Sequence, residues 1–169
     1  MARLVVCPLS RLGPTLTECG AAAVVTLLRQ GEPAPRLPPN HPHLRLELSD
    51  IVEALDGHML ATDEHLDRLF DFADIWDRRG PLLLHCYAGV SRSTAAAYVL
   101  ACRLEPETTE AQMARRLRSA SPTATPNARL VALADRRLGR SGRMIAAIGE
   151  IGRGAECFEG EPFSLDAGP

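Results

Sequence analysis

Short apolar runs alternate with longer helical repeats along the chain, and together they predict most of its secondary structure. Strands are expected where a short segment is apolar, β-branched or strictly alternating. These segments are residues 4–7, 23–28, 43–48 and 81–85. Helices are expected where a capping residue is followed by a longer segment with helical periodicity. These segments are residues 62–79, 93–104, 109–119, 127–138 and 141–151.

The remaining segments suggest how the domain is organised. Residues 10–20 are expected to form a loop or short helical turn, and the five prolines in 31–42 indicate an irregular surface loop. Residues 154–169 carry four acids, no base and little periodicity, so a flexible tail is expected after one domain at 1–153. Because strands and helices alternate, we expect an α/β fold with a mainly parallel sheet of four to five strands and helices on both faces.

Composition excludes several classes of protein. A hydrophobic content of 46% over 169 residues is enough for one buried core, and no apolar run approaches the length of a membrane span. A net charge of −2 does not favour a nucleic-acid partner. All 19 basic residues are Arg, which excludes a Walker lysine and Schiff-base chemistry and, with the high alanine content, hints at a GC-rich bacterial genome.

The five cysteines have neither metal-ligand spacing nor a paired disulfide framework. Their odd number favours a reducing compartment. There is no secretory leader pattern at the N-terminus. We therefore expect a cytoplasmic protein with no metal and no cofactor.

Charge is distributed unevenly along the chain. Residues 46–77 carry ten acids and one Arg, whereas residues 103–153 carry ten Arg and five acids. Solvated helix faces are the favoured explanation. The alternative is that some of these arginines line an anion-binding pocket.

The richest chemical signal is the segment between the apolar run at 81–84 and the alanine-rich run at 94–100. This context predicts a strand, a tight loop and a helix, with Cys86 and Arg92 at the two ends of the loop. A loop that opens a helix directs backbone N–H groups and the helix dipole into its concavity, which favours the thiolate form of Cys86. Arg92 adds a planar fork that can bind two phosphate oxygens.

The run from His85 to Ser93, a His-Cys pair followed by five residues, Arg and Ser, resembles the signature of the cysteine-dependent protein tyrosine phosphatase superfamily. It is most similar to the small dual-specificity-like branch, and the resemblance covers roughly residues 43–135. The resemblance implies that Cys86 attacks phosphorus to form a phosphocysteine, that Ser93 assists its breakdown, and that His85 supports the loop. It implies phosphoryl binding by the Arg92 side chain and by the loop backbone of Tyr87, Ala88, Gly89, Val90, Ser91 and Arg92.

The resemblance also requires an aspartic acid that protonates the leaving group, on a loop about thirty or more residues before the cysteine. Asp50 lies 36 residues before Cys86, directly after a predicted strand, and Asp56 lies 30 before it in a glycine-containing loop. We favour Asp50, because a residue just beyond a strand end is held more firmly than one in mid-loop. Asp63 is expected in the first turn of the next helix instead.

The expected activity is hydrolysis of phosphotyrosine, with dual specificity possible, in a phosphoprotein or a small phosphomonoester. An inositol-phosphate or phosphoinositide phosphatase is a second hypothesis, which the uncharged loop residues 87–91 disfavour. A non-catalytic phosphate-binding module is a third, and a sulfurtransferase or arsenate reductase fits the flanking His85 and Ser93 less well. No nucleic-acid or membrane partner is expected, and the oligomeric state is left open.

Overall fold

A five-stranded sheet in the order β3-β2-β4-β1-β5 forms the centre of the computed structural model, which describes residues 2–33 and 35–168. The first four strands are parallel, and β5 runs antiparallel to β1. The strands are β1 (Arg3–Pro8), β2 (Ala23–Leu28), β3 (His43–Glu47), β4 (Leu82–Cys86) and β5 (Phe163–Asp166). The expected mainly parallel sheet is confirmed, with β4 at its middle.

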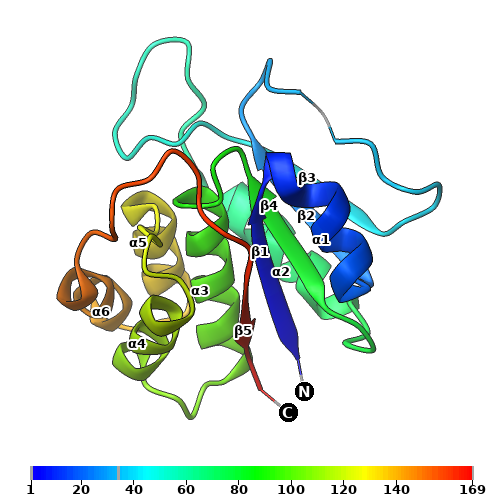
Figure 1. Ribbon diagram of the computed structural model, residues 1–169. Helices are drawn as coiled ribbons and strands as arrows, with labels where there is room; N and C mark the ends of the chain where they lie inside the picture. The colour runs from blue at the N-terminus through cyan, green and yellow to red at the C-terminus, as the bar shows by residue number, and fades with distance from the viewer. Residues whose placement is uncertain (1, 34, 169) are drawn as a thin grey trace.

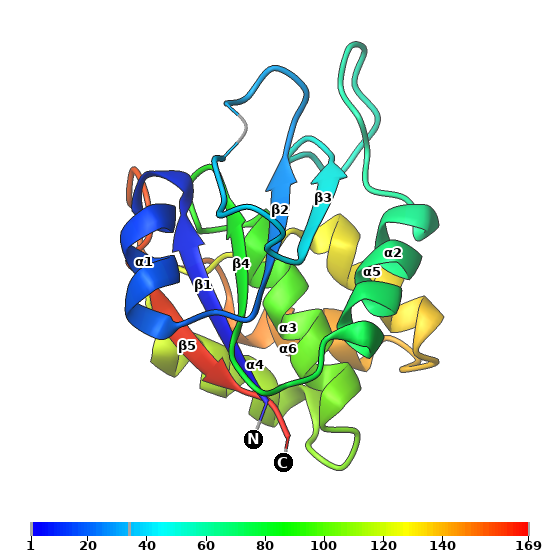
Figure 2. The ribbon, with the colours of Figure 1, turned by 90° about the vertical axis from the view of Figure 1, so that its right-hand side faces the viewer.

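Helices cover both faces of this sheet, as expected (Figures 1 and 2). One face carries a short 3-10 helix, η1 (Leu9–Arg11), and α1 (Leu12–Cys19). The other face carries α2 (Asp63–Ile75), α3 (Arg92–Leu104), α4 (Glu110–Ala120), α5 (Ala128–Arg137) and α6 (Arg143–Ile151). Helix α3 packs directly behind β1 and β4, and α2, α4 and α5 pack against it.

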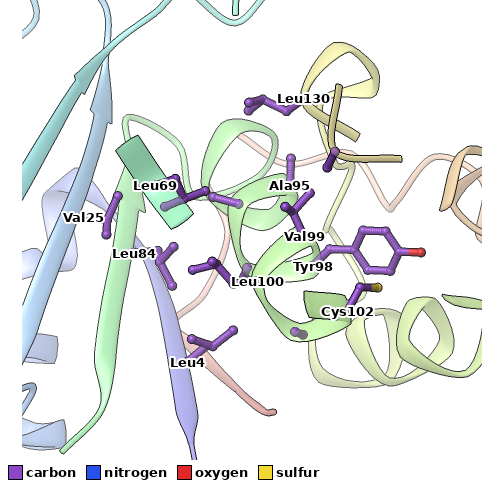
Figure 3. Packing of buried hydrophobic residues seen from close by; sticks show 14 of the residues in the cluster. Leu4, Val25, Leu69, Leu84, Ala95, Tyr98, Val99, Leu100, Cys102 and Leu130 are labelled. Carbon is purple, nitrogen blue, oxygen red and sulfur yellow. The ribbon is translucent and has the colours of Figure 1, made fainter. Parts of the chain in front are cut away.

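The main hydrophobic core lies between α3 and the sheet (Figure 3). Leu84 of β4 and Val25 of β2 face Leu100 of α3, and Leu69 closes the core from α2. The alanines of α3 are buried, which lets this helix pack close to the strands. Close packing fixes where α3 begins, and therefore fixes the loop that joins it to β4.

Two helical segments differ from the sequence-based expectation. Residues 10–20 were expected to be a loop or a short helical turn, but Leu12–Cys19 forms a helix of eight residues with Pro14 in its first turn, where proline is tolerated. The expected helix 62–79 ends early, at Ile75. Trp76 there adopts an extended backbone, buries its ring and donates its indole N–H to the Gly80 carbonyl at 2.9 Å.

Residues 154–168 are packed against the domain, whereas a flexible tail was expected for residues 154–169, the last of which lies outside the described residues. In this C-terminal segment residues 163–166 form β5, which buries Phe163 and Leu165 against the core. On the way to β5 the chain passes the top of the sheet, where the Ser10 hydroxyl donates a hydrogen bond to the Glu159 carboxylate and lies 2.9 and 2.8 Å from its Oε1 and Oε2. The alternation of Phe163 and Leu165 with polar residues is the strand signal that was outweighed by the acidic composition.

Some of the unevenly distributed charged residues form ion pairs between helices. Acids of α2 pair with arginines of α3 and α5 on the surface: Asp63 with Arg136, Asp67 with Arg137, and Asp74 with Arg103. Such exposed pairs each contribute at most about 1 kcal/mol. The favoured explanation, charged helix faces at the surface, therefore accounts for these three arginines.

Candidate active site

The loop between β4 and α3 lies at the carboxyl end of the central strand. Cys86 is the last residue of β4, Arg92 is the first residue of α3, and residues 87–91 turn the chain between them. Ligands bind at this end of open α/β sheets, because neighbouring strand ends leave a crevice there. The strand, loop and helix expected around Cys86 are thus all present.

Backbone donors outside the loop hold four of its carbonyl groups. These donors lie at the start of η1, in the turn before α5 and in the C-terminal segment. The bonds run from Leu9 N to Tyr87 O (3.0 Å), Gly160 N to Ala88 O (2.8 Å), Thr125 N to Val90 O (2.9 Å) and Asn127 N to Ser91 O (3.1 Å). Since the C=O and N–H of a trans peptide point in opposite directions, carbonyls held outward turn the loop N–H groups inward.

The sulfur of Cys86 lies inside this cradle and is almost fully buried. It accepts a hydrogen bond from the Gly89 N–H at 3.3 Å and lies 3.1 Å from the Ser93 hydroxyl. The Gly89 N–H and the Ser93 hydroxyl are thus both placed to donate to this sulfur when it acts as a nucleophile.

Gly89 is required by the close approach of β1 to the loop. Its φ is +68°, and a Cβ at this position would lie 2.7 Å from the backbone nitrogen of Pro8. A side chain here would be strained by its own backbone and would also push the loop away from β1.

The other cysteines differ from Cys86 in their surroundings. Burial raises the pKa of both Cys7 and Cys102 to about 12, so these thiols stay protonated at neutral pH. Burial also raises the pKa of Cys19, and Cys157 is exposed on the C-terminal segment. Among the five free cysteines, Cys86 alone is the residue at which β4 ends and the loop to α3 begins.

Arg92 is buried and fixed on one edge by two acceptors. Its Nη1 donates to the Glu32 carboxylate at 3.2 Å and to the Leu48 carbonyl at 3.1 Å. Its Nε is buried and has no hydrogen-bond partner among the described residues. The Nε and Nη2 edge of the guanidinium is thus the edge suited to bind two oxygens of a phosphoryl group.

Glu32 is a site residue that the sequence analysis missed. It lies after β2, within the proline-rich segment, and its side chain is 11% exposed. It is the single acid between residues 29 and 42. That isolation was the available signal, but its partner Arg92 lies 60 residues away in the chain.

Asp50 lies against the loop, and Asp56 does not contact it. Asp50 Oδ1 accepts a hydrogen bond from the Ser91 hydroxyl at 2.6 Å and one from the Asn127 side chain at 2.9 Å. Asp56 lies in an exposed turn of the long loop between β3 and α2, and Asp63 is in the first turn of α2, as expected. The geometry therefore favours Asp50 as the carboxyl group of this site.

Asn127 was expected to be a helix cap, and it is one. Its Oδ1 accepts the N–H of Leu130 at 3.1 Å, as an N-cap of α5 should. Its amide nitrogen meanwhile donates to Asp50 and to the carbonyl of Ile51. The second contact makes Asn127 part of the site as well.

His85 is completely buried beneath the loop. Its pKa is lowered to about 4, mainly by burial and also by the nearby His43 and Arg92, while a bond to the Cys86 carbonyl acts in the opposite direction. Its Nε2 lies 2.7 Å from the Thr26 hydroxyl. The imidazole is thus neutral at physiological pH and is held from both ends.

The surface beside the loop has two shallow depressions of about 870 and 600 Å³ that share Asp50 and Ser91 in their walls. The acids lining them are Asp50, Glu53 and Glu156, and Arg153 is the base. Tyr87 is 45% exposed at the loop itself. Of the arginines at 103–153, Arg153 is therefore the one that lines this surface.

The comparisons with known proteins place this architecture among the dual-specificity and tyrosine phosphatase folds. No family model and no curated protein sequence matches the chain. Human DUSP28 has a similar structure, with a TM-score of 0.63 and 22% identity over 80% of this chain and 88% of that one. The PTP-2 phosphatase of Cydia pomonella matches with a TM-score of 0.60 and 22% identity, over 78% and 83% of the two chains.

A human tyrosine phosphatase-like serine/threonine/tyrosine-interacting protein is also similar. Its TM-score is 0.57, with 17% identity over 80% of this chain and 91% of that one. These likenesses establish a shared fold. The activity has to be argued from the site itself.

None of the helices in residues 2–33 and 35–168 is both long and apolar enough to cross a bilayer. Within the same residues, His, Cys, Asp and Glu side chains form no cluster suited to hold a metal ion.

Proposed function

We propose that the chain is a cysteine-based protein tyrosine phosphatase that hydrolyses phosphomonoesters through a phosphocysteine at Cys86. One observation carries the proposal. The Cys86 sulfur lies at the bottom of a loop of inward N–H groups, bonded by Gly89 and next to Ser93, with the buried Arg92 at the end of that loop. A nucleophile beneath an anion cradle is what attack on a phosphate ester requires.

In the first step the Cys86 thiolate forms the S–P bond as the P–O bond to the leaving group breaks. Arg92 and the loop N–H groups bind the equatorial phosphoryl oxygens, where negative charge spreads in the transition state. Glu32 and the Leu48 carbonyl orient the guanidinium, so that its free edge faces the phosphoryl group without reorganisation.

Asp50 protonates the leaving oxygen in the same step. Both hydrogen bonds from Ser91 and Asn127 go to its Oδ1, so Oδ2 is the oxygen that carries and delivers the proton. In the second step water attacks phosphorus, the S–P bond breaks, and Asp50 takes the water proton back. Ser93, 3.1 Å from the sulfur, stabilises the departing thiolate.

Phosphotyrosine is the proposed substrate side chain, with dual specificity as the broader possibility. The exposed ring of Tyr87 offers a flat apolar wall to a phenyl ring at the loop. Substrates with several phosphates are disfavoured, because loop residues 87–91 are uncharged and acids outnumber bases in the surface beside the loop. An inositol-phosphate phosphatase is therefore the weaker enzymatic alternative.

A non-catalytic phosphate-binding module is the alternative from another class. The observation that favours it is the similarity in fold to a tyrosine phosphatase-like serine/threonine/tyrosine-interacting protein. Cys86, Arg92, Ser93 and the exposed position of Asp50 favour the enzyme. The proposal includes a reducing, cytoplasmic setting, which the five free thiols support.

The test is hydrolysis of p-nitrophenyl phosphate by the wild type, Cys86→Ser and Arg92→Lys. Both variants should lose turnover, since a hydroxyl is a poor nucleophile and an ammonium cannot bind two oxygens in a fork. Acid-quenched wild-type enzyme should carry a phosphoryl group on Cys86 by mass spectrometry, and Cys86→Ser should still bind phosphate. Wild-type phosphate binding without any turnover would instead support the binding module.

Side-by-side kcat/KM values on phosphotyrosine peptides, phosphoserine peptides and inositol phosphates test the substrate class. Phosphotyrosine peptides should be the most efficiently hydrolysed. An inositol phosphate that exceeds every phosphotyrosine peptide tried would favour the second enzymatic hypothesis.

A further inference from the structure

Three polar side chains on three neighbouring strands form a hydrogen-bonded chain beneath the loop. His43 of β3, Thr26 of β2 and His85 of β4 are linked through the Thr26 hydroxyl, which lies 2.8 Å from His43 Nε2 and 2.7 Å from His85 Nε2. Thr26 and His85 are fully buried and directly opposite in the β2–β4 register, whereas His43 reaches the surface. The proposed mechanism assigns no role to Thr26 or His43.

The hydrogen bond between His85 and the Cys86 carbonyl determines where the proton lies in each of the other bonds of this series. His85 Nδ1 lies 3.3 Å from the carbonyl oxygen of Cys86, and a carbonyl only accepts, so Nδ1 carries the proton. Because the buried imidazole is neutral, its Nε2 must then accept. Thr26 therefore donates to His85, and the same hydroxyl accepts the Nε2–H of His43.

We infer that Thr26 and His43 are positioning residues for the phosphate loop, which act by holding His85 as the Nδ1–H tautomer bonded to the Cys86 carbonyl. That carbonyl belongs to the first peptide unit of the loop, whose N–H is that of Tyr87. With the carbonyl held from below, the trans geometry points the Tyr87 N–H into the cradle. The inference deepens the proposed function, because it identifies what orients the first anion donor.

The Cys86 carbonyl is held differently from the carbonyls of the later loop residues. Backbone N–H groups hold the carbonyls of Tyr87, Ala88, Val90 and Ser91. The Cys86 carbonyl receives a side-chain proton, and that proton can bond it only in one of the two neutral tautomers of His85. Loss of the Thr26 hydroxyl would leave His85 Nε2 buried without its donor, and tautomerisation would then remove the bond to the carbonyl.

The spectroscopic test uses the wild type, and it requires no turnover. Long-range ¹H–¹⁵N correlation spectra at neutral pH should show His85 protonated at Nδ1 and bare at Nε2. A spectrum of the opposite tautomer, or of a doubly protonated ring, would overturn the inference.

The functional test compares Thr26→Val, which keeps the shape and removes the hydroxyl, with Thr26→Ser, which keeps the hydroxyl. Calorimetric titration with inorganic phosphate and vanadate should show affinity about tenfold weaker in Thr26→Val, a change typical for loss of one buried hydrogen bond. Thr26→Ser should recover most of it, and the tautomer should follow the affinity. If the hydroxyl had only a structural role, Thr26→Val would have a lower Tm, but the folded variant would bind anions as the wild type does. That result would refute the positioning role.

His43→Gln and His43→Ala keep the test decisive if Thr26→Val does not fold, because His43 is at the surface. Glutamine retains a donor and should retain anion affinity, whereas alanine should weaken it severalfold; equal affinities in both variants would overturn the role of His43. A wild type that binds vanadate but never turns over would refute the proposed function and leave this inference standing. A wild type that binds neither anion would refute both.

Discussion

Asp50 is joined to Asn127 by a 2.9 Å hydrogen bond from the amide nitrogen to Oδ1, across 77 residues of sequence. The backbone N–H of Asn127 also donates to the Ser91 carbonyl, and the Ser91 hydroxyl donates to Asp50. The three residues thus form a closed set of contacts between the phosphate loop, the loop carrying Asp50 and the start of α5. This set keeps the candidate acid at a fixed place relative to Cys86.

The first prediction concerns Asp50 as the proton donor. Asp50→Asn should lower kcat by roughly 10²–10⁴ on substrates with poor leaving groups, and by less on activated phenols, which leave with less help. Asp56→Asn is the matched control, since Asp56 lies in the exposed turn of the same loop. Rate measurements over a series of aryl phosphates check this, and a loss found in Asp56→Asn alone would reverse the assignment.

The second prediction separates the two roles of Asn127. Asn127→Ser keeps an N-cap acceptor and removes the donor to Asp50, so kcat should fall about tenfold while the unfolding free energy changes little. Asn127→Ala removes both and should also cost about 1 kcal/mol of stability. Urea unfolding and steady-state kinetics measure the two effects. Equal kcat in Asn127→Ser and the wild type would show that the contact with Asp50 is dispensable.

The third prediction concerns Gly89. Gly89→Ala should abolish phosphate binding, because its Cβ would collide with the Pro8 backbone and the positive φ disfavours any side chain. Gly57→Ala is the control: its φ is +78°, but a Cβ there meets nothing within 4 Å. That variant should lose only about 1 kcal/mol of stability and keep its phosphate affinity. Calorimetric titration measures the phosphate affinity of both variants. Wild-type affinity in Gly89→Ala would contradict the prediction.

The fourth prediction concerns stability at acid pH. Burial lowers the pKa of His85 from 6.5 to about 4, so between these values the unfolded chain binds a proton that the folded protein excludes. His85 therefore costs no stability above that window, and as pH falls through it the unfolding free energy should drop by up to about 3 kcal/mol. Urea titrations of the wild type and His85→Gln over this range isolate the effect from other groups. Parallel pH profiles would disprove it.

The loop and its flanking elements could be predicted because their signals are local. The apolar run before Cys86, the alanines after Arg92 and the spacing between the two residues are all contained in residues 81–104. Asp50 could be favoured over Asp56 for a similar reason, since the end of β3 is visible in the alternation that precedes it.

The features that were missed depend on partners distant in the chain. Glu32 is an ordinary loop acid until Arg92 lies beside it. Strand β5 has four residues and becomes a strand by pairing with β1, which lies about 160 residues earlier. Helix α1 was obscured by Gly13 and Pro14, which disfavour a helix interior but are accepted in a first turn.

The four outside donors that hold the loop carbonyls also have a consequence for folding. Leu9, Thr125, Asn127 and Gly160 come from both ends and the middle of the chain, so each closes a long stretch of sequence onto the same five residues. Contacts of such high sequence separation are costly in chain entropy and tend to form late. The anion cradle is thus completed together with the whole domain, and a chain in which residues 154–168 are not docked lacks the hydrogen bond that holds the Ala88 carbonyl.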